Sequence, residues 1–170
     1  MAPKFKSSPL TVGSKAPDFT LPDQDGNDVN LYALLQGGPV VVYFYPKTYT
    51  TVCTAEACSF RDSHELFSEA GASVVGISTD SIERQHSFHK RFRLTYPVLS
   101  DGKGRVHGQF GVRSGGGLGV GFLLNDRLTF VIDRDGSVRD VFRGLLVAGP
   151  HVKNSLATVR SLVDSREPDG

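Results

Sequence analysis

The chain has 170 residues, of which 39% are hydrophobic, and this is enough apolar material for one domain to bury a core of its own. Its 19 basic and 18 acidic side chains nearly cancel, leaving a net charge of +1, so nothing favours a nucleic-acid or membrane surface. The two cysteines are too few for a secreted disulfide scaffold, and a cytoplasmic, reducing compartment is the expected location.

The chain begins with MAPKFKSSPL, which contains two lysines but no apolar stretch behind them. We therefore expect no secretory signal, although a plastid location stays open if a transit peptide has been removed. Residues 1–10 are predicted to be a flexible lead-in, residues 11–165 a single domain and residues 166–170 a tail. No apolar run approaches the roughly 18–20 residues that a bilayer span needs.

Strand-like and helix-like segments alternate along the chain, which is typical of an α/β protein. Strands are predicted at Phe19–Leu21, Val29–Leu31, Val40–Tyr45, Val74–Ser78, Tyr96–Leu99, Leu128–Ile132 and Val138–Arg143. Helices are predicted at Tyr32–Leu35, Cys53–Ala70, Ser81–Arg91, Gly104–Phe110 and Val152–Val163. The second helix has an apolar stripe of Phe60, Leu66 and Phe67, and Ser81 is a candidate N-cap for the third. A βαβ half, followed by two strands around the hairpin turn Asp133–Gly136 and a last helix, predicts a thioredoxin fold. We expect a central mixed sheet flanked by helices, with an N-terminal β extension.

The stretch VVVYFYPKTYTTVCTAEACSFRD, residues 40–62, organises the rest of the chain. Val40–Tyr45 has the composition of a strand buried on both faces, and Pro46 ends it because proline has no N–H to donate. Cys53 then stands where a loop becomes the first turn of a helix, the usual place for chemistry in open α/β sheets. The free N–H groups and the dipole of a helix start favour the thiolate, which is the reactive form of cysteine. The alternative reading is that Cys53 is a small buried hydrophobe.

Cys58 lies five residues after Cys53 on the same predicted helix. In an intact α-helix the two Cα atoms are then roughly 8–9 Å apart, whereas a disulfide needs less than about 7 Å. The pair can close only if the helix start unwinds, which is plausible at a helix terminus. Alternatively, Cys58 packs in the core and never oxidises.

The segment FYPKTYTTVCTAEACSFRD resembles the active site of the peroxiredoxins, and most closely the bacterioferritin-comigratory-protein or PrxQ branch of the AhpC/TSA superfamily. That branch has a Pro-x-x-x-Thr/Ser-x-x-Cys motif, often with a second cysteine five residues on. The matching residues are Pro46, Thr50, Cys53 and Cys58, with Glu56 and a Ser-Phe-Arg-Asp run behind them. The resemblance covers most of the chain, from Gly13 to about Val141. The chain departs from the family at Thr48-Tyr49, where acidic residues are common, and at Thr51-Val52, where Pro-Gly is common.

This resemblance implies the peroxiredoxin fold and a thiol-dependent peroxidase that reduces hydrogen peroxide and organic hydroperoxides. Cys53 would attack the O–O bond and become a sulfenic acid, and Cys58 would resolve it as a disulfide that thioredoxin reduces. Thr50 and Arg127, with backbone N–H groups near Thr51 and Val52, would hold the peroxide. No haem, flavin or metal cofactor is implied. An intramolecular disulfide needs no second subunit, so a monomer is expected, with a weak dimer as the alternative.

Arg127 immediately precedes the predicted strand Leu128–Ile132, where this branch carries an arginine that reaches the cysteine. A guanidinium is always charged and presents a fork of donors, so it suits a thiolate and a peroxide oxygen together. The alternatives are a solvated surface arginine at this position and Arg61 as the cation of the site. Glu56 lies one turn after Cys53 and either positions an arginine or balances the helix dipole. Phe110 either flanks the site, as an aromatic does in the family, or packs in the core.

Other patterns favour simpler readings. His86 and His89 share a helix face but have no further ligand at metal spacing, so no metal site is expected. The glycine-rich run Ser114–Gly121 does not fit the spacing of a dinucleotide-binding loop. Two other functions stay open: a thioredoxin-like protein disulfide oxidoreductase, which normally shows Cys-x-x-Cys, and a non-enzymatic redox sensor.

Overall fold

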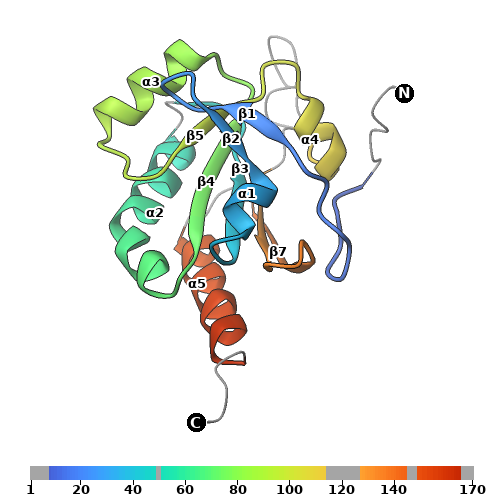
Figure 1. The fold of residues 1–170 in the computed structure, drawn as a ribbon. Coiled ribbons are helices and arrows are strands. Elements are labelled where there is room, and N and C mark those ends of the chain that lie inside the picture. Colours follow the sequence, from blue (N-terminus) through green and yellow to red (C-terminus); the bar gives the residue numbers. More distant parts are fainter. Residues whose placement is uncertain (1–7, 49–50, 114–126, 145–148, 166–170) are drawn as a thin grey trace.

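A five-stranded mixed sheet forms the centre of the molecule (Figure 1). The computed structural model describes residues 8–48, 51–113, 127–144 and 149–165, with only the backbone for residues 51 and 52. Across the sheet the strand order is β5 (Val98–Ser100), β4 (Ser73–Ser78), β3 (Val40–Phe44), β6 (Leu128–Ile132) and β7 (Val138–Arg143). The first three strands are parallel, and β6 and β7 run antiparallel to their neighbours. The predicted thioredoxin-type mixed sheet is confirmed.

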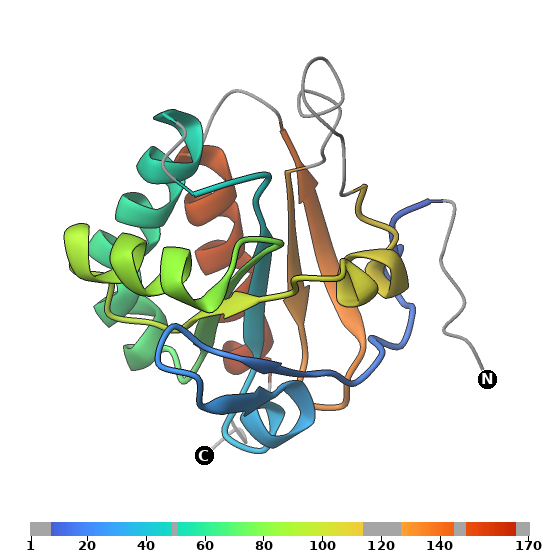
Figure 2. The same cartoon turned by 90° about the horizontal axis from the view of Figure 1, so that it is seen from above.

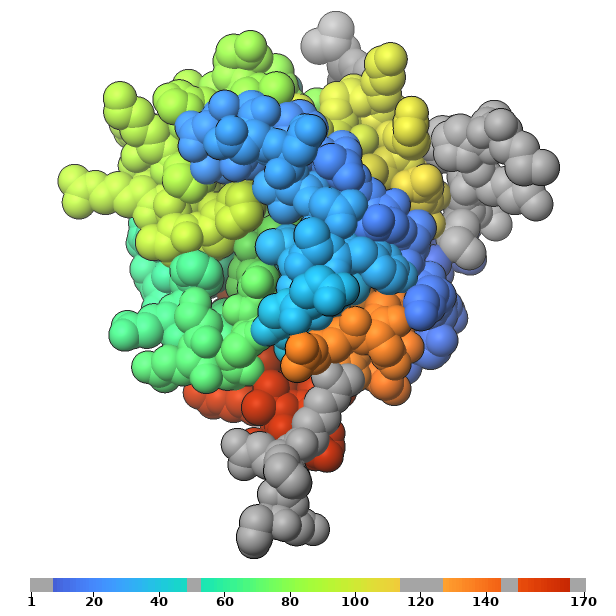
Figure 3. Space-filling view, in the orientation of Figure 1, coloured from blue at the N-terminus to red at the C-terminus, as the bar shows by residue number. Residues whose placement is uncertain are grey.

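Helices cover both faces of this sheet, as Figure 2 shows from above. One face carries α2 (Thr51–Glu69), α3 (Ile82–Arg91) and α5 (Gly149–Asp164). The other carries α1 (Leu31–Leu35), α4 (Arg105–Phe110) and the hairpin of β1 (Thr20–Pro22) and β2 (Asp28–Asn30). In the space-filling view the N-terminal segment and α1, in blue, lie across the middle of this second face (Figure 3). Within the described ranges, every helix is too short or too polar to span a bilayer.

Strand β3 is buried on both faces, as its composition predicts. Because successive side chains alternate across a strand, β3 contributes to two separate cores. Val40, Val42 and Phe44 pack toward α1 and α4. Val41 and Tyr43 pack toward α2 and α5, in the same cluster as Cys53. Cys53 therefore lies on the face of the sheet to which β3 contributes Val41 and Tyr43.

The prediction that residues 1–10 form a flexible lead-in is wrong at Leu10. Leu10 is only 3% exposed, and its N–H donates to the carbonyl of Phe110 at 3.1 Å. An apolar side chain close to the first strand is better buried than left in water, so the folded part includes Leu10. Residues 1–7 and the predicted tail, 166–170, lie outside the described residues.

Several predicted element ends are shifted by one to three residues. Helix α2 begins at Thr51 rather than Cys53, α5 at Gly149 rather than Val152, and β5 at Val98 rather than Tyr96. Helix α5 takes Pro150 into its first turn, where the missing N–H costs no hydrogen bond. Leu66 does not belong to the apolar stripe of α2, because it is 40% exposed while Phe60 and Phe67 are buried. Phe60 and Phe67 are seven residues apart and share a face, which Leu66 does not.

Gly111 fixes the N-terminal segment against the end of α4, and we expect Gly111→Ala to destabilise the fold. Its φ is +71°, and a Cβ there would overlap the carbonyl oxygen of Ser8. Backbone strain of this kind costs about 1–3 kcal/mol before the clash is relieved. Chemical denaturation should show this loss, whereas Gly102→Ala, where a Cβ meets open space, should change little. Equal stabilities of the two variants would contradict the packing described here.

Candidate active site

Cys53 lies in the first turn of α2, at the carboxyl end of β3, as its sequence context predicts. Its side chain is 1% exposed. Its sulfur is not merely packed among apolar groups, because Nη2 of Arg127 donates a hydrogen bond to it at 3.0 Å. A guanidinium at this distance stabilises negative charge on the sulfur.

Arg127 reaches Cys53 because of the pairing between β6 and β3. The two strands are antiparallel, with Leu128 opposite Phe44, so the residue before β6 lies beside the carboxyl end of β3. Leu128 packs toward α1 and α4, so alternation points the side chain of Arg127 toward α2. Arg127 is 3% exposed, and the alternative of a solvated surface arginine is wrong.

Arg61, the rival cation, is bound elsewhere. Its Nη1 donates to the carbonyl of Phe92 at 2.6 Å, and its Nε and Nη2 donate to the carboxylate of Asp62. These contacts tie α2 to the end of α3. The structure therefore brings Arg127, and not Arg61, into contact with the sulfur of Cys53.

Glu56 lies one turn beyond Cys53 and is fully buried. Its Oε2 accepts a hydrogen bond from Nη1 of Arg127 at 2.8 Å. This contact favours a role in positioning the arginine over a role in balancing the helix dipole. Burial raises the pKa of the Glu56 carboxyl to about 7, although Arg127 acts in the opposite direction. Glu56 and Cys53 thus share the guanidinium of Arg127.

The other predicted site residues are placed less fully. The strand that we predicted to run to Tyr45 ends at Phe44, so Pro46 lies two residues beyond β3, where it is partly buried. Thr50 lies outside the described residues, and Thr51 and Val52 form the first two residues of α2 with their side chains undescribed. Phe110 packs against Phe44 and Phe130 in the core on the opposite face of the sheet from Cys53. Of its two readings, the structure favours core packing.

Cys58 is half-buried on α2, and both cysteines are free thiols. The helix continues without interruption from Cys53 to Cys58. The expected separation of roughly 8–9 Å in an intact helix therefore applies to this pair. A bond between the two sulfurs requires the start of α2 to unwind.

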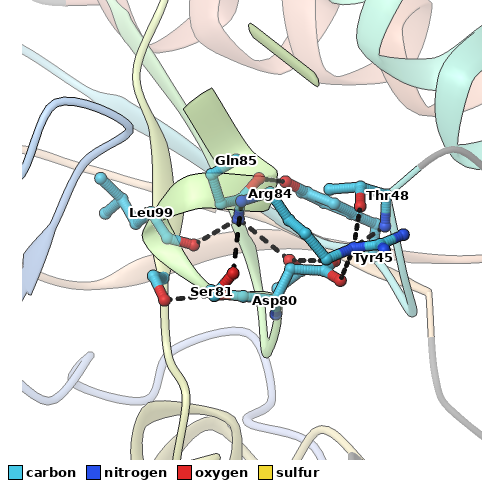
Figure 4. Close-up of polar contacts among 9 residues, drawn as sticks. Tyr45, Thr48, Asp80, Ser81, Arg84, Gln85 and Leu99 are labelled. Atoms are coloured by element: carbon cyan, nitrogen blue, oxygen red, sulfur yellow. Dashed lines mark hydrogen bonds and ion pairs between the residues drawn. The ribbon is translucent and has the colours of Figure 1, made fainter. Parts of the chain in front are cut away.

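A polar cluster that was not predicted from the sequence holds Tyr45 and Thr48, which follow β3 (Figure 4). The N–H of Thr48, which is 1% exposed, donates to Oδ2 of Asp80 at 2.8 Å. Nε of Arg84 lies 3.2 Å from Oδ1 of Asp80 and donates to the Thr48 hydroxyl at 3.3 Å. The hydroxyl of Tyr45 donates to Gln85 on α3 at 2.5 Å. Polar residues just after β4 lie at the same sheet edge as Thr48, and this was the available signal.

His151 is a second residue that the sequence did not point to. It lies in the first turn of α5, is 3% exposed, and its Nδ1 is 2.8 Å from the hydroxyl of Thr129. Burial, and then the charge of Arg127, lower the pKa of His151 to about 4. The imidazole is therefore neutral at physiological pH and adds no second positive charge beside Arg127.

Glu56 and His151 should make opposite contributions to the pH dependence of stability. Folding raises the pKa of Glu56 from 4.5 to about 7, so the folded chain binds this proton more tightly than the unfolded chain does. The resulting contribution of Glu56 to the free energy of unfolding is full below pH 4.5 and is lost as pH rises from 4.5 to 7. Folding lowers the pKa of His151 from 6.5 to about 4, so its contribution is lost as pH falls through that window. The two effects largely cancel in the wild-type protein.

Single substitutions should expose each effect. In His151→Asn the free energy of unfolding should fall between pH 4.5 and 7, by an amount on the order of 3 kcal/mol for the Glu56 shift. In Glu56→Gln the free energy of unfolding should instead rise as pH rises from about 4 to 6.5, because only the His151 shift remains. Urea denaturation across this range measures both, and the difference between the two variants cancels the ionisable groups that they share. If the two variants had parallel profiles of stability against pH, Glu56 and His151 would not have opposite effects.

These features define a class of protein: a thioredoxin fold with a buried cysteine at a helix start and an arginine bonded to its sulfur. Comparison with known proteins agrees. The AhpC/TSA family model matches residues 12–141. Chloroplastic peroxiredoxin Q of Sedum lineare is 42% identical over 153 residues, which cover 90% of this chain and 80% of that protein.

Solved structures give the same result. The crystal structure of peroxidoxin BcpB from Mycobacterium tuberculosis has a TM-score of 0.82 and 45% identity, covering 90% of this chain and 98% of that one. Peroxiredoxin Q of Xanthomonas campestris has a TM-score of 0.78 and 27% identity, covering 93% of this chain and 99% of that one. This chain belongs to the AhpC/TSA family and within it to the peroxiredoxins of the Q type, which are thiol-dependent peroxidases.

Proposed function

We propose that Cys53 is the peroxidatic cysteine of this peroxiredoxin and that Arg127 is its charge-stabilising partner. The observation that carries the proposal is the 3.0 Å hydrogen bond from Arg127 to the sulfur, deep in the fold at the start of α2. A thiolate is the nucleophile in this chemistry, and the arginine and helix start both stabilise it.

In the first step the thiolate sulfur of Cys53 attacks one oxygen of a hydroperoxide, and the O–O bond breaks. Cys53 becomes a sulfenic acid, and the other oxygen leaves as an alcohol or water. The fork of Arg127, with Thr50 and the backbone N–H groups of Thr51 and Val52, stabilises the charge on the leaving oxygen. Pro46, two residues beyond β3, keeps the strand from continuing into this loop. Hydrogen peroxide and organic hydroperoxides both fit this scheme.

In the second step Cys58 condenses with the sulfenic acid and water leaves. Because an intact α2 separates the two residues, its first turns unwind, and the contacts of Arg127 with Cys53 and Glu56 are given up. The Thr48–Asp80 hydrogen bond lies outside the helix and provides a fixed point for this motion. Thioredoxin then reduces the disulfide by thiol–disulfide exchange.

The same scheme bears on assembly and location. An intramolecular Cys53–Cys58 disulfide needs no second subunit, so the enzyme works as a monomer, with a weak dimer as the alternative. Residues 11–165, together with the buried Leu10, act as one domain, and the reducing cytoplasm supplies thioredoxin.

Peroxide titration of the reduced protein tests this function. One equivalent of peroxide should give an intramolecular disulfide between Cys53 and Cys58, identified by mass spectrometry of non-reduced peptides. Thioredoxin with its reductase should restore both thiols and sustain peroxide consumption. Insulin reduction without peroxide consumption would favour a protein disulfide oxidoreductase instead. Oxidation no faster than that of free cysteine would favour a redox sensor.

A further inference from the structure

Glu56 and Cys53 share the guanidinium of Arg127. Nη1 donates to Oε2 of Glu56 at 2.8 Å, and Nη2 donates to the sulfur of Cys53 at 3.0 Å. The side chains of Glu56, Arg127 and Cys53 are 0%, 3% and 1% exposed. Among the described residues, Arg127 is the one basic side chain that forms an ion pair with Glu56. A single positive charge cannot balance a carboxylate and a thiolate together, and an excess buried charge is costly.

The carboxyl of Glu56 has an oxygen available for a proton. Oε1 is buried and has no hydrogen-bond partner within the described part of the chain. An ionised carboxylate would leave a charged oxygen without a donor, and this costs more than leaving a neutral hydroxyl without an acceptor. A proton on Oε1 removes that charge, and Oε2 can still accept the hydrogen bond from Arg127.

The neighbouring ionisable groups do not change this charge balance. Tyr43 on β3 and Tyr96 ahead of β5 lie within range of the carboxyl's charge, and burial, with a smaller effect of Glu56, raises the pKa of both phenols. Both are therefore neutral. His151 on α5 lies near Arg127 and is also neutral, because burial and then Arg127 lower its pKa. Burial raises the pKa of Glu56 itself to about 7, which agrees with the charge count.

We propose that Glu56 holds a proton while Cys53 is a thiolate and releases it when Cys53 is oxidised, so that the carboxyl is the proton source for the leaving group of the peroxide. This inference rests on the proposed function. Glu56 acts through the shared Arg127, so it is a proton reservoir and a positioning residue, with no contact to the peroxide required.

The step balances in atoms and charge. The sulfur of Cys53 forms a bond to one peroxide oxygen, the O–O bond breaks, and the other oxygen departs with the electron pair. Sulfur is oxidised by two electrons and the peroxide is reduced by two. Once the sulfur is a neutral sulfenic acid, Arg127 has Glu56 as its anionic partner, and the carboxyl gives up its proton. The leaving oxygen takes up one proton and leaves as alcohol or water, so the net charge of the site is unchanged.

Proton uptake during a single oxidation tests the inference. Reduced protein carrying Cys58→Ser, which stops the reaction at the sulfenic acid, is mixed with peroxide at pH 6 in weak buffer with a pH indicator. With Glu56 present, the leaving group is protonated internally and little proton is taken from solution. With Glu56→Gln, about one further proton per sulfenic acid should be taken up. The difference should shrink by pH 8, where Glu56 has already ionised.

Glu65→Gln is the matched control, because Glu65 is exposed on the same helix. It should behave as the protein with Glu56 intact. Equal proton uptake with and without Glu56 would overturn the inference. If peroxide forms no sulfenic acid on Cys53 at all, the proposed function fails instead, so the two failures are distinguishable.

Difference infrared spectroscopy gives a second readout that needs no substitution at Glu56. Adding peroxide should remove the carbonyl band of a protonated carboxyl and produce a carboxylate band. This measurement keeps the inference falsifiable if Glu56→Gln does not fold. An unchanged carboxyl band during sulfenic acid formation would show that Glu56 does not release its proton and would overturn it.

Discussion

Replacing Cys53 by serine is expected to abolish peroxide turnover. The serine hydroxyl is close to the thiol in size, so the packing of the first turn of α2 should survive. It does not ionise near neutral pH, so the arginine beside it has no thiolate to stabilise. Stopped-flow measurement of peroxide consumption should give only the uncatalysed rate. Normal turnover by Cys53→Ser would end the assignment of this sulfur as the reactive one.

Cys58→Ser is the matched control, because it changes the same atom five residues along the same helix. It should still consume one equivalent of peroxide, since the first step uses Cys53 alone. Cycling with thioredoxin should stop, because no disulfide forms for thioredoxin to reduce. The different patterns of the two variants separate the attacking sulfur from the resolving one.

The fold was predictable where local pattern determines structure. Val40–Phe44 is apolar at every position, and both strands around Asp133–Gly136 have the predicted bounds, because composition and turn residues act over a few neighbouring positions. Element ends were less predictable. Helix α5 begins ahead of Pro150, where a proline is tolerated but does not by itself mark a helix start, and the burial of Leu10 depends on a contact with Phe110 a hundred residues away.

The candidate site was predictable in part. The position of Cys53 follows from a strand, a proline and a helix in sequence, all within one short segment. The contact of Arg127 spans 74 positions, and it depends on the antiparallel register of β6 on β3. A family resemblance could suggest it, but no local pattern could. His151 and the Asp80 cluster had no such motif, because each makes its contact across elements that the fold alone brings together.

Replacing Arg127 by methionine is expected to slow the oxidation of Cys53 and to destabilise the fold. Methionine keeps much of the apolar stem but removes the charge at the sulfur, and losing one such donor typically costs about 10²–10³-fold in rate. At pH 8 the ionised carboxyl of Glu56 is then left buried without its partner, and breaking a buried pair in this way costs about 3–5 kcal/mol. The stability loss should be smaller at pH 5 than at pH 8, because Glu56 can then take up a proton and become neutral.

The double variant Arg127→Met with Glu56→Gln separates the two effects of the arginine. Glutamine carries no charge, so removing Arg127 no longer strands a carboxylate, and denaturation should show that much of the lost stability returns. The oxidation rate should stay low, because the sulfur still lacks its cation. Arg61→Met should leave the rate near that of wild type, since Arg61 donates to Phe92 and Asp62 rather than to Cys53. If the double variant recovered the rate together with the stability, Arg127 would serve the fold and not the sulfur, and the proposed chemistry would lose its cation.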